Sequence, residues 1–169
     1  FLHSFILPVS AELCNVINPL KNKKMATVSI YLNFEGTTEE AFTFYKSVFK
    51  TEFNGGIMYN KDIPAHEGMP PLPDDELNKV MHVSLPVLGG INIMGTDMLA
   101  SMGHQLIVGN NTTINLEPDS RAETERLFNA LSEGATDIMP LQNMFWGAYW
   151  GCCLDRFGIR WMFNHTPQQ

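Results

Sequence analysis

The sequence has little of what membrane-spanning, nucleic-acid-binding and disulfide-stabilised proteins require. No apolar run among its 169 residues reaches the roughly 18–20 residues that cross a bilayer, which excludes a transmembrane protein. Its 11 Lys and Arg face 18 Asp and Glu, so the chain lacks the basic face that nucleic acid or an anionic membrane needs. Three cysteines (Cys14, Cys152 and Cys153) cannot form a disulfide framework. We therefore expect a cytoplasmic protein with neither nucleic acid nor membrane as a partner.

What is present is a globular composition, with 44% hydrophobic and 17% charged residues, which fits one domain or two small subdomains sharing a core. Residues 1–24 stand apart because they show no clear period and carry a charge of +2, against −9 for residues 25–169. Their cations follow the apolar stretch, whereas a secretory signal has them first. We expect an extension that is poorly ordered or loosely docked; the alternative is a cleaved targeting segment.

The rest of the chain shows one pattern of elements twice. Residues 27–35 are rich in β-branched and aromatic types, which predicts a strand. Thr37 or Thr38 can cap a helix that continues to about residue 50 at helical apolar spacing. The proline-rich segment 60–78 predicts a surface loop. Further strands are expected near 53–59, at 79–87 and at 91–97, with Gly89-Gly90 as a tight turn between the last two.

The second half repeats this order without obvious residue identity. Residues 112–117 predict a strand, and Pro118-Asp119-Ser120 leads into a helix that ends at Gly134. Strands are then expected near 136–142, 146–154 and 158–164. Each half thus reads as a strand, a helix and three strands, which indicates an α+β fold with one helix behind each sheet.

Three stretches together resemble one known family. They are YLNFEGTTEEAFTFYKSVF (31–49), KVMHVSLPVLGGINIMGTD (79–97) and MPLQNMFWGAYWGCCLDRFGIRWMFN (139–164). Over residues 25–165 the chain resembles the PhnB-like branch of the vicinal oxygen chelate superfamily, which includes glyoxalase I, bleomycin-resistance proteins and extradiol dioxygenases. The resemblance implies paired βαβββ modules that form a cupped mixed β-sheet with the helices on its outer face, usually assembled as a homodimer.

On this reading, module one spans 25–97, a linker spans 98–111, module two spans 112–165, and 166–169 form a tail. Members of this branch are sometimes labelled as ubiquinone methyltransferase-like. The sequence does not support that activity, because it has no Gly-rich loop between a strand and a helix to cradle a nucleotide-like cofactor. We expect no cofactor.

The resemblance also implies a metal site with one ligand on the first and last strand of each module. Carried onto this chain, the four positions fall at Ser29 (or Ile30), Met94, Thr113 (or Asn111) and Met162. Two thioethers with hydroxyl or amide groups suit a hard divalent ion poorly, because such ions prefer carboxylate and imidazole. We therefore predict no metal at this position.

No other residue presents a clear catalytic motif. His82 is the one histidine on a predicted core strand, where it is either a structural residue or an acid–base group of a cavity. Cys152 and Cys153 alternate along a strand and are interpreted as structural. Asp74-Asp75-Glu76 lies among prolines and is interpreted as a solvated loop. We assign no catalytic residue.

Strand alternation predicts which side chains line a cavity. Leu32 and Phe34 are expected to pack on the helix, which turns Tyr31 and Asn33 to the opposite face. Trp146 is expected near a cavity mouth or a subunit contact. The full set of expected ligand-binding residues is Tyr31, Asn33, His82, Met94, Trp146, Arg160 and Met162.

These residues favour a metal-free, homodimeric protein that binds a small organic ligand. One alternative is a lyase- or dioxygenase-type enzyme that uses a metal placed elsewhere or cofactor-free proton transfer through His82. The other is a structural or interaction module whose dimer surface is its function.

Overall fold

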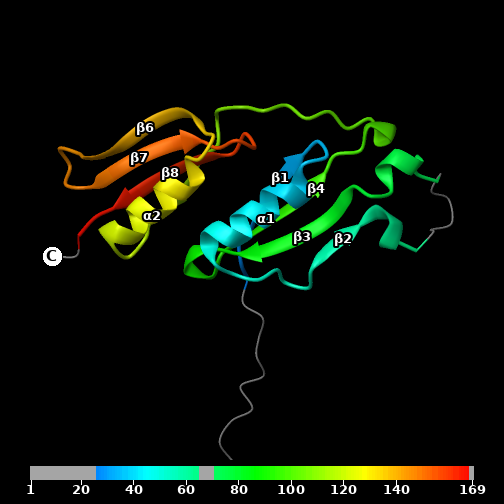
Figure 1. Cartoon of the computed structure of the whole chain (residues 1–169), viewed down its shortest axis with the longest axis horizontal. Coiled ribbons are helices and arrows are strands. Elements are labelled where there is room, and N and C mark those ends of the chain that lie inside the picture. Colours follow the sequence, from blue (N-terminus) through cyan, green and yellow to red (C-terminus); the bar gives the residue numbers. More distant parts are fainter. Residues whose placement is uncertain (1–25, 65–70, 168–169) are drawn as a thin grey trace, which may run out of the picture.

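In a computed structural model, the described residues are 26–64 and 71–167. The expectations for residues 1–24 lie outside these ranges. The described chain forms two four-stranded mixed sheets, each with one helix across one face (Figure 1). Within these ranges, no helix has the length and hydropathy needed to cross a membrane.

Module one has the strand order β1-β4-β3-β2, with β1 parallel to β4 and the other pairs antiparallel. The helix α1 packs on β3 and β4. The turn at Gly89 and Gly90 forms as predicted, and both glycines have positive φ. The elements are β1 (Ile30–Phe34), α1 (Thr38–Phe49), β2 (Ile57–Tyr59), β3 (Val80–Pro86) and β4 (Asn92–Asp97).

Module two repeats this topology in the order β5-β8-β7-β6, with β5 parallel to β8. Ser120 caps the helix α2, since its hydroxyl accepts a 3.2 Å hydrogen bond from the Glu123 amide. The helix ends at Leu131, one turn before the predicted Gly134. The elements are β5 (Ile114–Leu116), α2 (Arg121–Leu131), β6 (Thr136–Asn143), β7 (Tyr149–Leu154) and β8 (Arg160–His165).

The predicted α+β architecture is confirmed, with every expected strand present. Most strands are shorter than the apolar patterns suggested, most clearly β2, where only 57–59 of the predicted 53–59 form a ladder. Both helices lie on the same side of the two sheets, while the edge strands β6 and β2 mark opposite ends (Figure 1). One side of each sheet is therefore covered by a helix, and the other is the inner face of the cup.

The core lies between the helices and the sheets. Leu32 and Phe34 are buried, as predicted, together with the apolar face of α1. At Gly95 an added Cβ would overlap the ring of Phe42, so a glycine is needed there for α1 to approach β4. In module two both the helix and the strand supply a ring, because Phe163 of β8 packs edge-to-face on Phe128 of α2.

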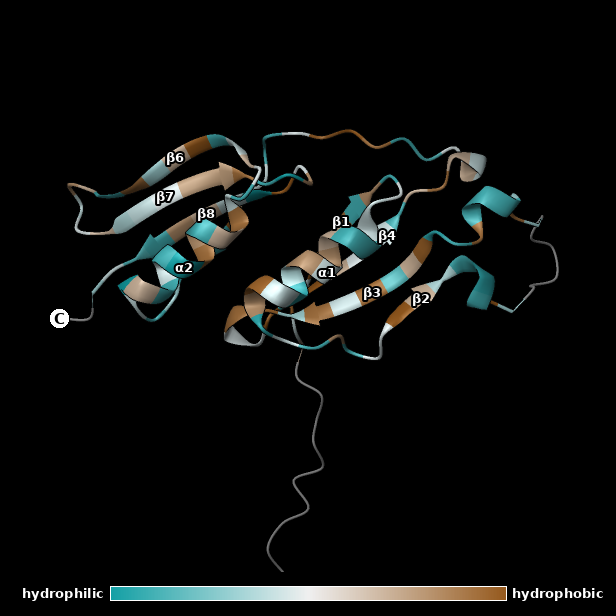
Figure 2. Cartoon of the chain, in the orientation of Figure 1, coloured by the Kyte–Doolittle hydropathy of each residue, from teal (hydrophilic) through white to brown (hydrophobic). Residues whose placement is uncertain are grey.

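Both modules share this core. Tyr45 of α1 packs against Trp161 of β8, with ring centroids 5.6 Å apart, and both side chains are fully buried. Arg126 of α2 donates a 2.8 Å hydrogen bond to the carbonyl oxygen of Val48. The two helices therefore hold the modules together. Figure 2 shows hydrophobic stretches that lie outside this core, along the linker before β5 and along β6.

Candidate functional site

The inner face of the first sheet carries four of the predicted ligand-binding residues. Tyr31 and Asn33 on β1 are exposed, while Leu32 and Phe34 between and beyond them are buried. Strand register pairs Tyr31 with Met94 of β4. The phenol of Tyr31 and Nδ1 of His82 on β3 are 3.3 Å apart, within hydrogen-bonding distance. Tyr31 and His82 therefore meet across β4.

The inner face of the second sheet carries two more of the predicted residues, Arg160 and Met162 on β8. Register pairs Met162 with Asn115 of β5 and with Cys152 of β7. Arg160 Nη2 donates a 3.1 Å hydrogen bond to Oδ2 of Asp137. Within the described residues, the buried Nε of Arg160 has no hydrogen-bond partner, which leaves this guanidinium only partly satisfied.

A groove of about 300 Å³ joins the two sheets. Its walls are β1, the linker and the turn between β7 and β8. Of the predicted residues, it brings together Tyr31, Asn33 and Arg160. Apolar side chains supply much of the remaining wall, among them Leu106, Ile107, Val108, Phe157 and Ile159. An apolar wall with a few polar groups is the usual composition of a small-molecule site.

Trp146 is not part of this arrangement. It lies in the turn between β6 and β7, 52% exposed, and packs edge-to-face on Phe145, which is 96% exposed. The groove lining contains neither residue. The sequence suggested a cavity mouth or a subunit contact for Trp146; Trp146 does not line this groove, and both suggestions stay predictions.

The structure shifts the positions that the resemblance implied for a metal. Ser29, Thr113 and Asn111 lie outside the strands, and the residues paired with Met94 and Met162 are Tyr31 and Asn115. A phenol, an amide and two thioethers do not fit a hard divalent ion. In the described ranges no three His, Cys, Asp or Glu side chains are grouped closely enough to hold a metal. The absence of a metal stays a prediction.

A larger hollow, of about 520 Å³, lies between the turn at Leu88 and Gly89 and the start of α2. None of the predicted ligand-binding residues lines it. Its carboxylates include Glu117, which accepts a hydrogen bond from Asn164, and Glu123, which pairs with Arg126 at 2.6 Å. Asp119 adds a third carboxylate. Because the lining holds none of the residues predicted to bind a ligand, this hollow is the weaker candidate for a ligand site.

Buried carboxylates are the polar residues that sequence reasoning missed. The carboxylate of Asp155 follows β7 and accepts hydrogen bonds from two backbone amides and from the side chains of Tyr45 and Trp161. Asp97 closes β4, and its carboxylate accepts from the amides of Gly36, Thr38 and Val80 and from the Thr38 hydroxyl. The sequence did hold one signal for these residues, since each acidic residue ends or follows a strand with buried apolar residues. A carboxylate in such a place is almost never buried without partners, so its position predicts hydrogen bonds.

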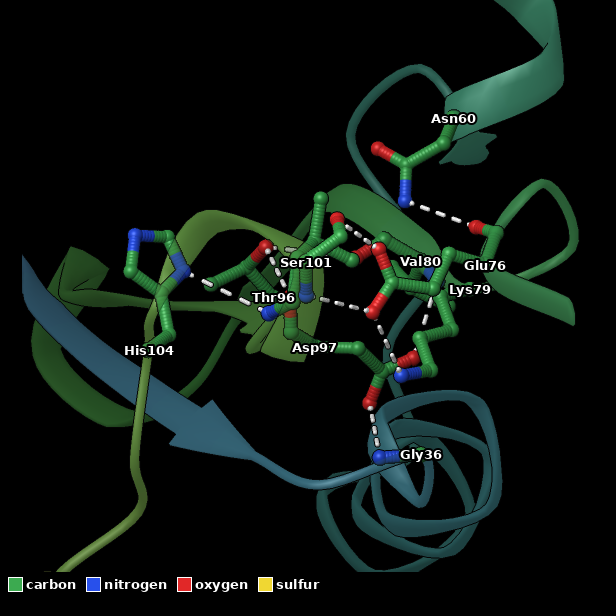
Figure 3. A network of polar contacts seen from close by, with 10 residues as sticks. Gly36, Asn60, Glu76, Lys79, Val80, Thr96, Asp97, Ser101 and His104 are labelled. Atoms are coloured by element: carbon green, nitrogen blue, oxygen red, sulfur yellow. Dashed lines mark hydrogen bonds and ion pairs between the residues drawn. The ribbon is translucent and has the colours of Figure 1, made fainter. Parts of the chain in front are cut away.

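The interpretation of Asp74-Asp75-Glu76 as a solvated loop is wrong for Glu76. Its residue is only 2% exposed, and its carboxylate accepts hydrogen bonds from the amide and hydroxyl of Ser101 (Figure 3). The Ser101 hydroxyl is the main cause of a lowered Glu76 pKa, with a smaller contribution from Lys79. Glu76 thereby connects residues 74–76 to the start of the linker. Asp74 and Asp75 are exposed, as predicted.

A lowered carboxyl pKa predicts a pH-dependent contribution to stability. The Glu76 contacts should stabilise the fold above the unfolded-state pKa of about 4.3, and this stabilisation should be lost as the pH falls through the lower folded-state value. We expect Glu76→Gln to lower the free energy of unfolding at pH 7, and the deficit to shrink below pH 4. Urea unfolding at both pH values measures it. Asp75→Asn is the matched exposed control, and an equal deficit at both pH values would contradict the assignment.

Comparison with known proteins agrees with this fold. The family model described as 3-demethylubiquinone-9 3-methyltransferase matches residues 26–163. The chain is 27% identical to protein YjdN of Escherichia coli over 146 residues, which are 84% of this chain and 97% of YjdN. The crystal structure of PA1353 from Pseudomonas aeruginosa is 34% identical, with a TM-score of 0.72, over 85% of this chain and all of that one.

More distant solved structures show the same fold. A PhnB protein from Bacillus cereus is 22% identical, with a TM-score of 0.64, over 83% of this chain and all of that one. A glyoxylase/bleomycin resistance protein/dioxygenase domain from Frankia is 10% identical, with a TM-score of 0.55, over 85% of this chain and 98% of that one. These two structures share the fold of this chain. The family model covers most of the chain, which therefore belongs to the family described as 3-demethylubiquinone-9 3-methyltransferase.

Proposed function

We propose that this protein binds a small organic molecule, without a metal, in the groove between β1, the linker and the β7–β8 turn. The observation that carries the proposal is the meeting of Tyr31, Asn33 and Arg160 in one partly apolar groove. Such a site gains affinity from apolar contact and orientation from its few polar groups. The donors at the four family positions support the metal-free part of the proposal, since they suit no hard cation.

A thermal-shift screen of the full chain against a broad set of small organic molecules tests this proposal. A ligand present at 100 times its Kd stabilises a protein by about 2.7 kcal/mol, which for a chain of this size raises Tm by about 5–10 °C. Elemental analysis of the purified protein tests the metal-free part. A screen without any stabilising compound would contradict ligand binding, and stoichiometric Ni, Zn, Mn or Fe would contradict the absence of a metal.

Proton transfer without a cofactor is a second candidate function. It is favoured by the contact between the Tyr31 hydroxyl and His82 Nδ1 beside the groove, because a histidine oriented by a phenol can move a proton at neutral pH. Exchange of a ligand C–H for deuterium, followed by NMR, tests it. We expect His82→Gln to abolish the exchange and Tyr31→Phe to slow it. Binding without exchange would leave only the binding function.

We also propose that the protein is cytoplasmic and forms a homodimer. In this dimer a second copy covers the β6–β7 end of module two. Ile138, Met139, Phe145 and Trp146 are exposed there, on an edge strand and its turn. Exposed aromatic residues of this kind are typical anchors of protein interfaces.

We expect the double variant Phe145→Ser, Trp146→Ser to weaken association at least tenfold, measured by light scattering across a dilution series. Met102→Ser, which removes an exposed apolar side chain from another surface, is the matched control. A monomeric wild-type protein would refute the dimer, and a fully dimeric double variant would place its interface elsewhere.

A further inference from the structure

The charges along the groove are unlike those of the rest of the protein. The chain carries a net charge of −7. Among the described residues that line the groove, by contrast, Arg160 alone has a formal charge at neutral pH, and none is a carboxylate. A cation in a partly apolar wall attracts an anion more strongly than it would in open water.

The guanidinium of Arg160 also has hydrogen-bonding capacity to spare. It holds five N–H donors. Among the described residues, one donates to Asp137, while the buried Nε finds no partner. The side chain of Asp137 is 65% exposed. An ion pair with so exposed a partner is weak, so another carboxylate can compete with Asp137 for the same guanidinium.

Much of the rest of the lining is apolar. Ile107 and Val108 of the linker are 83% and 61% exposed, and they line the groove together with Leu106 and Phe157. Such side chains fit an alkyl or aryl body rather than a polar one. The two parts of the lining therefore suit one molecule with an anionic head and an apolar body.

We infer that the groove takes small organic carboxylates, whose head group binds Arg160 in place of Asp137 and whose apolar body lies against the linker. This inference rests on the proposed binding function and adds the chemical class of the ligand. Arg and carboxylate form paired, charge-assisted hydrogen bonds, and a volume of about 300 Å³ accommodates molecules of the size of arylalkanoates.

Calorimetric titration of the full chain with phenylacetate, 3-phenylpropanoate and 4-phenylbutanoate tests the inference, each beside its neutral amide. We expect at least one acid to bind tenfold or more tightly than its amide at pH 7. Arg160→Met should remove this preference, and Arg160→Lys should keep part of it. Arg156→Met is the matched control. Arg156 lies in the turn just before Arg160, stacks on Phe44 and does not line the groove.

A second variant is expected to act in the opposite direction. Asp137→Asn removes the competing carboxylate, and asparagine tolerates the positive φ of 47° at this position. Acid binding should become about threefold to tenfold tighter, while amide binding stays unchanged. A structural role of Arg160 alone would not produce this gain.

The outcomes separate this inference from the proposed function. Neutral compounds that bind in the groove as tightly as the acids, with no effect of Arg160→Met, would overturn the carboxylate preference and leave ligand binding in place. The carboxylate preference would also be overturned if no acid bound to wild type or to Asp137→Asn while other compounds stabilised the protein in the thermal-shift screen. Ligand binding would again remain in place. Failure of all compounds in both experiments would overturn the proposed function as well.

Discussion

Replacing Asp155 by alanine is expected to lower the free energy of unfolding by about 3 kcal/mol or more, because it leaves several buried donors without an acceptor. Oδ2 of Asp155 accepts from the hydroxyl of Tyr45 and the indole Nε1 of Trp161, both at 2.7 Å. Oδ1 accepts from the amides of Phe157 and Ile159, both at 2.9 Å. Because Tyr45 belongs to module one, the loss also weakens the contact between modules. Urea unfolding followed by tryptophan fluorescence measures it.

Two conservative variants sharpen this test. Asp155→Asn keeps one acceptor oxygen and should cost less than Asp155→Ala. Tyr45→Phe removes a single donor and should cost about 1 kcal/mol. Burial and the neighbouring Asp155 carboxylate both raise the Tyr45 pKa, so the phenol stays a donor across the whole neutral range. Glu133→Ala changes an exposed acid and is the control. An Asp155→Ala variant as stable as this control would contradict the assigned role.

Replacing Asp97 by alanine should have an effect of similar size in module one. Its carboxylate accepts from the amides of Gly36 and Thr38 at 2.9 and 3.1 Å, and from the Thr38 hydroxyl at 2.6 Å. It also accepts from the Val80 amide at 2.8 Å. Without it, the start of α1 and the start of β3 would both lose their acceptor. We expect a destabilisation of about 3 kcal/mol or more.

Hydrogen exchange distinguishes this local effect from a general loss of stability. In Asp97→Ala the amides of Thr38 and Val80 should exchange faster relative to the amide of Ile93, a buried residue near the start of β4. Thr38→Val removes only the hydroxyl donor and should cost about 1 kcal/mol. Uniform acceleration at all three amides would argue against a specific role of Asp97.

The sequence predicted the strands and helices well because their signals are local. Alternation of buried and exposed residues in 30–34 and helical spacing in 38–49 follow from backbone periods of two and 3.6 residues. Their ends were less predictable. The helix α1 is stabilised at its start by Asp97, 59 residues away, whereas the side chain of Thr37 forms no capping hydrogen bond.

The candidate site was predicted in part for the same reason. Strand alternation predicted Tyr31, Asn33 and Arg160 as polar groups of a cavity, and all three line one groove of the structure. The role of the linker could not be predicted, because residues 106–109 follow no period and acquire a role only by lying against β1 and the β7–β8 turn. The burial of Glu76 was missed for a similar reason, since its partner Ser101 is 25 residues away.

The opening features of the sequence, few cysteines, few cations and no long apolar run, bounded the class of protein, and its repeated periodicity determined the α+β modules. Only the tertiary structure decided which carboxylates are buried, that the linker forms a wall of the groove, and that Arg160 pairs with Asp137. The physical reason is range. Periodicity arises from the geometry of neighbouring residues, whereas the environments of Asp97, Asp155 and Arg160 arise from segments that only folding brings together.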